Sequence, residues 1–268
     1  MNYKIIALDL DGTLTNSEKV ITPKTKEALM MIQEQGVKVV LASGRPTCGI
    51  KKLAEELELA KYGGFVLPFN GGQVIEWSTG KVIHSKTLEP DIAQEIVRLA
   101  KSHYVNLVTY KDDQLLCLEQ YDMYAKIEAG INGMQIVQPE DYEKEISSID
   151  VPKYIMLEDA NYLVTVEKSM AILLKDKCEC FCSAPYFLEI CPMGIDKGKS
   201  LDVLLNYLGM ERKDLIAVGD SFNDKSMIEL AGLGVCMRNG RDEIKKIADF
   251  VTLSNDDDGI AHLINMYF

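Results

Sequence analysis

The feature of this sequence that most limits its fold is a repeated alternation of apolar strands with amphipathic helices. Residues 3–9, 37–43 and 64–70 read as buried strands, and helices are predicted at 22–36 and 46–59. Near-continuous apolar strands separated by helices are typical of a parallel sheet that is covered on both faces. The first part of the chain therefore predicts an α/β domain.

The pattern changes after Gly71, where shorter segments predict antiparallel strands and a few helices. From "FLEIC" onward the alternation of strands and helices returns. The simplest architecture is a Rossmann-like parallel-sheet core with an inserted α+β cap domain. We expect the core to comprise residues 1–82 and 188–268, and the cap residues 83–187.

Composition and charge exclude several classes of function. The 268 residues carry 41 acidic and 29 basic side chains, a formal net charge of -12, which argues against a nucleic-acid surface. No apolar run approaches the roughly 18 residues of a membrane span. The N-terminus also lacks the basic region of a signal peptide. We therefore expect a cytoplasmic protein without a membrane or nucleic-acid partner, in which any phosphate site is made locally positive.

The seven cysteines indicate free thiols in a reducing compartment. Three of them, Cys178, Cys180 and Cys182, form the stretch "CECFC". Their alternation predicts a strand with all three sulfurs on one face. A metal site is the alternative, although zinc sites usually use a wider cysteine spacing.

Polar groups lie next to the predicted carboxyl ends of the core strands. Asp9 and Asp11 follow the first strand, Ser43 follows the second, Asp220 ends a later one, and Lys197 begins a helix. Ligands of open α/β sheets bind at these strand ends, so we expect the five side chains to converge. Carboxylates so close together repel each other and suit Mg²⁺. A lysine and a hydroxyl beside them predict a phosphoryl-transfer site.

The same residues lie in four short motifs, "DLDGT", "LASGR", "DKG" and "GDSFND". In order and spacing these resemble the four signatures of the haloacid dehalogenase superfamily. The inserted module lies between the second and third motifs, which resembles subclass IIB, the Cof-like sugar-phosphatase branch. The resemblance covers the whole chain.

That resemblance implies a role for each acidic residue. Asp9 would be the nucleophile that forms an aspartyl-phosphate, and Asp11 the general acid and then the general base. Lys197 would offset their charge. Mg²⁺ would be held by the Asp9 side chain, the Asp11 backbone carbonyl and Asp220, with Asp224 in a supporting position.

The resemblance also implies a set of residues around the phosphate and the substrate: Leu10, Thr13, Ser43, Gly44, Arg45, Asn70, Gly71 and Asn223. For three of these residues a structural role is the alternative: Ser43 and Asn70 could be capping or turn residues, and Arg45 could pair with a surface acid. Lys225 stands where the family often has an acidic residue. The stretch "NDDDG" at 255–259 predicts the N-cap of the last helix.

The predicted function is Mg²⁺-dependent hydrolysis of a small phosphorylated metabolite, with a sugar phosphate as the expected substrate class. Two alternatives stay open. A phosphomutase-type phosphotransferase would use the same two aspartates but return the phosphate to its substrate. A non-catalytic sensor of a phosphorylated ligand would keep the fold without turnover.

Overall fold

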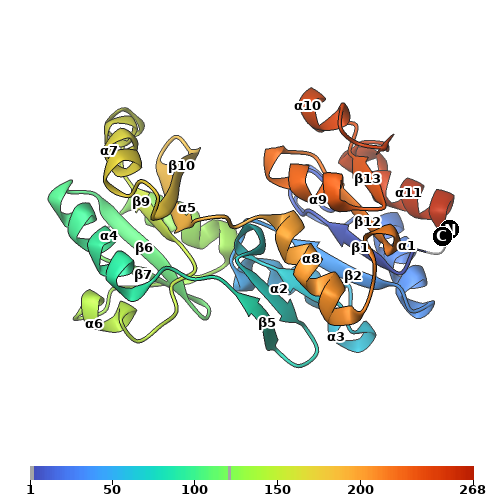
Figure 1. Ribbon diagram of the computed structural model, residues 1–268, viewed down its shortest axis with the longest axis horizontal. Coiled ribbons are helices and arrows are strands. Elements are labelled where there is room, and N and C mark those ends of the chain that lie inside the picture. Colours follow the sequence, from blue (N-terminus) through green and yellow to red (C-terminus); the bar gives the residue numbers. More distant parts are fainter. Residues whose placement is uncertain (1–2, 120–121) are drawn as a thin grey trace. The chain divides into compact units, whose positions relative to one another are not determined.

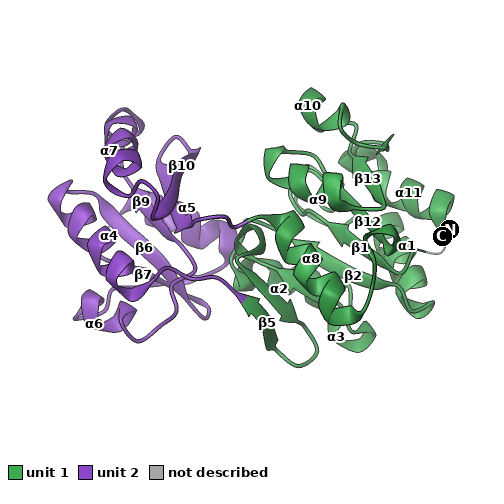
Figure 2. Cartoon of the chain, viewed as in Figure 1, with its two compact units in different colours: residues 1–84, 196–268 green, residues 85–195 purple. Residues whose placement is uncertain are grey.

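The structure, a computed structural model, describes residues 3–119 and 122–268. The chain forms two compact units (Figure 2), Met1–His84 with Asp196–Phe268, and Ser85–Ile195. The second boundary lies after residue 195 instead of 187 because "FLEIC" belongs to a strand of the second unit. That strand, β11 (Phe187–Pro192), pairs with the neighbouring strands of the second sheet and not with the first. The expected domain boundaries are corrected accordingly.

The first unit is built on an eight-stranded sheet (Figure 1). In spatial order its strands are β14 (Phe250–Val251), β13 (Leu233–Cys236), β12 (Leu215–Gly219), β1 (Ile5–Leu8), β2 (Lys38–Ala42), β3 (Phe65–Leu67), β4 (Gln73–Glu76) and β5 (Lys81–Ser85). The strands from β14 to β3 are parallel, and β4 is antiparallel to β3. The parallel sheet predicted from the apolar strands is therefore present.

Helices connect these strands. They are α1 (Pro23–Glu34), α2 (Thr47–Glu56), α3 (Leu59–Tyr62), α8 (Lys197–Leu208), α9 (Lys225–Leu230), α10 (Asp242–Lys245) and α11 (Gly259–Tyr267), with short 3₁₀ helices η1 (Phe69–Gly71), η2 (Arg212–Asp214), η3 (Phe222–Asp224) and η4 (Asn255–Asp257). Thr22 caps α1, because its side chain accepts a hydrogen bond from the Thr25 amide.

The core of the first unit covers both faces of the sheet, and β1 shows why. Alternate side chains of a strand point to opposite faces. Ile6 and Leu8 belong to one apolar cluster, with residues of α1 and α11. Ile5 and Ala7 belong to another, with residues of α8 and α9. β1 is also paired along both edges, with β12 and β2, and these two ladders fix the position of the residue that follows the strand.

In residues 85–119 and 122–195, the second unit has a six-stranded sheet and four helices. In spatial order the strands are β10 (Cys178–Ala184), β11, β9 (Tyr154–Leu157), β6 (Asn106–Lys111), β7 (Gln114–Cys117) and β8 (Gln135–Val137), and the helices are α4 (Pro90–Ser102), α5 (Met123–Asn132), α6 (Tyr142–Ile146) and α7 (Ala160–Leu173). The sequence pattern did not predict α5 or β8. Within the described parts of the chain, no helix has the length and apolar character needed to cross a membrane.

The cysteines of "CECFC" lie on β10, as their alternation predicted. Cys178 is buried in the apolar cluster of the second unit, Cys180 packs against that cluster, and Cys182 is exposed. All three are free thiols. Among the described residues, the one cluster of metal-donor side chains consists of aspartates alone, so the alternative of a cysteine metal site finds no support.

A buried ion pair in the second unit makes its stability testable. Lys153 Nζ lies 3.0 Å from a carboxylate oxygen of Glu189, with side chains 5% and 11% exposed. Lys153→Met leaves the Glu189 charge buried without its partner, and we expect the free energy of unfolding to fall by about 3 to 5 kcal/mol. The double variant Lys153→Met with Glu189→Leu should recover most of that loss. Urea denaturation measures both, and equal losses in the two variants would contradict the prediction.

Candidate active site

Asp9 and Asp220 meet because two parallel strands end side by side. β1 pairs with β12 in the register Leu8 to Val218, and the Asp9 amide continues the ladder by donating to the Val218 carbonyl at 3.0 Å. Asp9 follows β1 directly and Asp220 follows β12. The carboxyl ends of the strands therefore bring together side chains that are more than two hundred residues apart in the sequence.

Lys197 enters the same site from the first turn of α8. Asp196 caps this helix by accepting a hydrogen bond from the Lys199 amide at 2.8 Å. The Lys197 side chain is completely buried, and its ammonium group lies 2.6 Å from Asp9 Oδ1 and 2.7 Å from Asp224 Oδ1. A positive charge is unfavourable at a helix N-terminus, so the two carboxylates account for its position.

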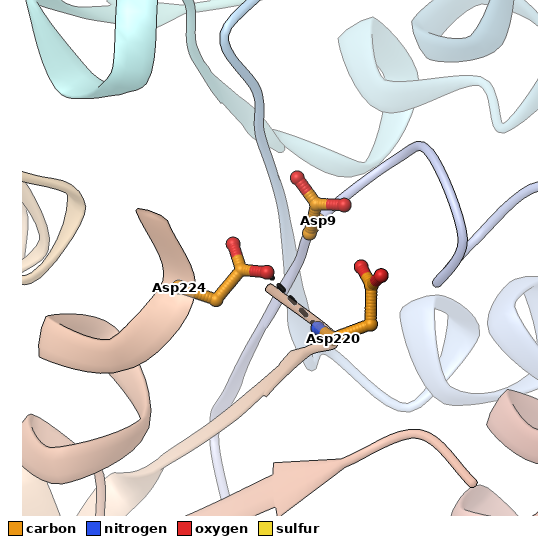
Figure 3. A group of neighbouring side chains, drawn as sticks. All are labelled: Asp9, Asp220 and Asp224. Atoms are coloured by element: carbon orange, nitrogen blue, oxygen red, sulfur yellow. Dashed lines mark hydrogen bonds between the residues drawn. The ribbon is translucent and has the colours of Figure 1, made fainter. Parts of the chain in front are cut away.

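Asp224 is held rigidly beside Asp220 (Figure 3). Its Oδ2 accepts hydrogen bonds from the backbone amides of Asp220 and Ser221, at 2.9 and 3.0 Å. A side chain at Gly219 would collide with the Asp224 Cβ, so glycine is needed where β12 ends. Because both Asp224 oxygens already accept hydrogen bonds, this residue is suited to supporting the site and less to binding a ligand directly.

The electrostatics of the group favour a cation. Asp9, Asp220 and Asp224 can each place a carboxylate oxygen within 4.8 Å of the others; Asp9 and Asp224 are buried, and Asp220 is half-buried. Burial and the nearby Asp224 charge raise the pKa of Asp9 to about 8, although Lys197 opposes this rise. The same two causes raise the pKa of Asp220 to about 6. Three carboxylates beside one lysine leave an excess negative charge that a divalent cation with oxygen ligands would neutralise.

Asp11 points to a different set of partners. Arg45 binds it in a bidentate manner, with Nε 2.9 Å from Oδ2 and Nη2 2.7 Å from Oδ1. Lys19 Nζ lies 2.8 Å from the same Oδ1. Burial alone would raise the pKa of Asp11, but the hydrogen bonds and charges of Arg45 and Lys19 outweigh it and lower the pKa below its usual value. Asp11 is therefore held as a carboxylate.

These contacts explain the position of Arg45 and add Lys19 to the site. Arg45 does pair with an acid, as one alternative held, but that acid is Asp11. Lys19 was not recognised from the sequence; its closeness to Asp11 in the chain was the only available signal. It sits in a turn with a positive φ of 62°, which a helix-and-strand pattern does not predict.

Thr13, Ser43, Asn70 and Asn223 are the other predicted site residues whose side chains make hydrogen bonds. Thr13 Oγ1 donates to Asp220 Oδ1 at 3.1 Å, so it contacts an acidic residue of the cluster. Ser43 is buried, and its hydroxyl accepts a hydrogen bond from the Arg45 amide at 3.2 Å, which is a turn contact. Asn70 Oδ1 accepts a hydrogen bond from Asn223 Nδ2 at 3.0 Å.

Gly44 lies against Asn70, because a Cβ at Gly44 would be 3.3 Å from the Asn70 amide group. Leu10 and Gly71 make hydrogen bonds near the site through their backbone carbonyls. The Leu10 side chain is fully buried while its carbonyl accepts from the Thr15 amide at 2.9 Å. The Gly71 carbonyl accepts from Ser200 Oγ at 2.6 Å, a contact with α8.

Two further sequence expectations are refined by the structure. Lys225 is exposed and lies 3.8 Å from Glu229 on the same helix, outside the acidic group. Asp258 directly precedes α11, as the N-cap prediction required, but its side chain does not cap the helix. Its carboxylate instead accepts a hydrogen bond from the Thr22 hydroxyl. The prediction that this stretch supplies the N-cap of the last helix is therefore confirmed at Asp258, which has a left-handed backbone and makes no side-chain capping hydrogen bond.

The chain resembles known proteins along its whole length. Residues 6–264 match the model of the haloacid dehalogenase-like hydrolase family. A haloacid dehalogenase-like hydrolase from Bacteroides thetaiotaomicron has a solved structure that is 43% identical, with a TM-score of 0.96 over 100% of both chains. In Bacillus subtilis strain 168, the 5-amino-6-(5-phospho-D-ribitylamino)uracil phosphatase YcsE is 30% identical over 264 residues, covering 98% of this chain and 95% of its own.

The fold also matches that of the subclass IIB sugar phosphatase BT4131, which is 24% identical with a TM-score of 0.78 over 98% of both chains. Several relatives are named as phosphatases, and the family consists of phosphoric monoester hydrolases. The match of the family model to nearly the whole sequence, together with the acidic group at the ends of β1 and β12, shows that this chain belongs to the haloacid dehalogenase-like hydrolases.

Proposed function

We propose that this protein is a Mg²⁺-dependent phosphatase that hydrolyses a small phosphorylated metabolite, with a sugar phosphate as the substrate class, through an aspartyl-phosphate on Asp9. The observation that carries the proposal is the buried contact of Asp9 with Lys197 inside a group of three carboxylates. The relatives support the substrate class, since one is named for a phosphoribityl compound and another is called a sugar phosphatase. In this proposal the first unit is catalytic and the second is the cap domain that determines specificity.

In the first half-reaction, a carboxylate oxygen of Asp9 attacks the phosphorus atom and the bond from phosphorus to the ester oxygen breaks. The departing alkoxide takes a proton from the Asp11 carboxyl group. Lys197, fixed 2.6 Å from Asp9, offsets the negative charge that gathers around the phosphoryl group. Because Arg45 and Lys19 hold Asp11 ionised, these contacts must loosen when the substrate binds for Asp11 to carry the proton.

In the second half-reaction, water attacks the phosphorus atom of the aspartyl-phosphate and gives a proton to Asp11. The bond between Asp9 and phosphorus breaks, and inorganic phosphate leaves. The pairing of Asp11 with Arg45 and Lys19 favours the ionised form that accepts this proton. One residue can thus act as acid and then as base, because the two half-reactions run in opposite proton directions.

The residues at the site fit a divalent cation. Asp9, Asp220 and the Asp11 carbonyl are the proposed ligands, and Asp224 would orient the surrounding water. Bound Mg²⁺ would screen the carboxylates and polarise the phosphoryl oxygens. Ser43, Gly44, Asn70 and Asn223 are proposed to contact the phosphoryl group. The contact between Asn70 and Asn223 supports this assignment, since it joins two elements beside the acidic group.

One prediction of the proposed function concerns the nucleophile. Asp9→Asn should reduce phosphate release by at least about 10³-fold, because the amide keeps the volume of the side chain but cannot attack phosphorus. Its thermal midpoint without metal should equal or exceed that of the wild type, since one of three mutually repelling charges is gone. Asp112→Asn, in the tight turn between β6 and β7, is the matched control. Phosphate release near the wild-type rate from Asp9→Asn would end the aspartyl-phosphate proposal.

Another prediction of the proposed function concerns the metal. Chelator should reduce turnover to background, and Mg²⁺ should restore it. In the absence of substrate, Mg²⁺ at 100 times its Kd should stabilise the wild type by about 2.7 kcal/mol. Asp220→Asn should shift the Mg²⁺ dependence of the thermal midpoint to higher concentrations, whereas Asp112→Asn should not. Full activity in chelator would remove the cation from the proposal.

Substrate class is tested by measuring phosphate release from a panel of sugar phosphates, nucleotides, pyridoxal phosphate and phosphoglycolate. We expect the highest kcat/KM with a phosphorylated sugar or polyol. If an ester is rearranged while no free phosphate accumulates, the phosphomutase alternative is correct. Tight binding of one ester without turnover would instead favour the non-catalytic sensor.

A further inference from the structure

Two asparagines, Asn239 and Asn255, donate hydrogen bonds to the turn 12–15, which follows Asp9 and Asp11. Asn239 Nδ2 donates to the Gly12 carbonyl at 2.7 Å. The backbone amide of Asn255 donates to Asn239 Oδ1 at 3.0 Å, and the side-chain Nδ2 of Asn255 donates to the Thr15 carbonyl at 3.0 Å. The orientation of both side-chain amides is determined, because each nitrogen faces a carbonyl that can only accept. The four residues thus form one continuous chain of hydrogen bonds.

The same turn contacts the acidic residues of the site. Thr13 Oγ1 donates to Asp220, and the Leu14 amide donates to the Asp9 carbonyl at 3.2 Å. Gly12 has a φ of +83°, and a Cβ there would lie 2.8 Å from Asp220 Oδ2. A displacement of the turn would therefore move Thr13 and Gly12 relative to Asp220, and Asp9 and Asp11 relative to the phosphorus atom.

Further contacts join the segments on either side. Asp256 accepts hydrogen bonds from the Ser17 amide and hydroxyl at 2.8 and 2.7 Å, and Asp258 accepts from the Thr22 hydroxyl. Three residues of the stretch 255–258 thus bind the stretch 15–22 in the same order along the chain: Asn255 binds Thr15, Asp256 binds Ser17 and Asp258 binds Thr22. Lys19 lies within the latter stretch, and its ammonium group contacts Asp11.

We propose that Asn239 and Asn255 are positioning residues that hold the turn 12–15, and through it Asp9, Asp11 and Asp220, in the arrangement that the reaction needs. The proposal rests on the proposed phosphatase function and assigns a role to "NDDDG" that helix capping does not explain. Carbonyl groups of a turn with a left-handed residue lack the partners that a regular strand supplies, so side chains must provide them. Small displacements of reacting groups cost up to about 10²-fold in rate.

The experiment compares Asn239→Ala, Asn255→Ala and the double variant with Asn206→Ala, an exposed asparagine near the C-terminal end of α8. We expect each single variant to lower kcat by about 10- to 100-fold while KM changes by less than about twofold. The double variant should lose less than the product of the two single effects, because both asparagines belong to one chain of hydrogen bonds. Asn206→Ala should keep the wild-type kcat.

Amide hydrogen exchange of residues 9–18 in the metal-free protein supplies a readout that needs no substrate. Faster exchange confined to this segment together with lower kcat supports the proposal. Unchanged exchange overturns it, and so does faster exchange with the kcat of the control, since the asparagines would then be merely structural. If the wild type turns over no ester, the proposed function fails by itself. The Mg²⁺ concentration that half-saturates the thermal shift then replaces kcat, and an unchanged value overturns the positioning role.

Discussion

The buried contact of Lys197 with Asp9 and Asp224 is the interaction on which the rest of the site depends. A fully buried ammonium group is stable only when carboxylates pair with it. The ends of β1 and β12 and the start of α8 must therefore meet at one point, where Asp9 and Asp224 bind Lys197. Each element prepares that meeting: β1 is buried on both faces, Gly219 makes room for Asp224, and Asp196 sets where the helix begins. Even so, three carboxylates face one lysine, and this excess of negative charge is the reason that a divalent cation is proposed at the site.

Much of this arrangement could be predicted from the sequence, because its determinants are local. Apolar strands buried on both sides announce a parallel sheet, and the carboxyl ends of such strands lie at one edge. Asp9, Asp220 and Lys197 were expected to converge on that basis, and the structure places them together. The direction in which a carboxylate points could not be predicted. Asp11 is only two residues from Asp9 in the sequence, but its side chain binds Arg45 and Lys19.

The parts that could not be predicted depend on distant pairing or on unusual backbone. "FLEIC" has the apolar pattern of a core strand, and only its antiparallel partners β9 and β10 show that it belongs to the second sheet. α5 was missed although Asp122 and Gly133 cap its ends, because its apolar periodicity is weak. The contacts of Asn239 and Asn255 join segments more than two hundred residues apart, and no local pattern reports such contacts.

The pairing of β1 with β12 has a consequence for the order in which the protein assembles. Ile5 and its partner Leu215 are separated in the chain by the whole second unit, so Leu215 is synthesised much later than Ile5. Domains fold as they emerge, but contacts this distant in sequence form late. A nascent chain therefore contains β1 and Asp9 before Lys197 and Asp220 have been synthesised. The acidic group and its lysine can come together only after β12 and the residues up to Asp224 have been synthesised.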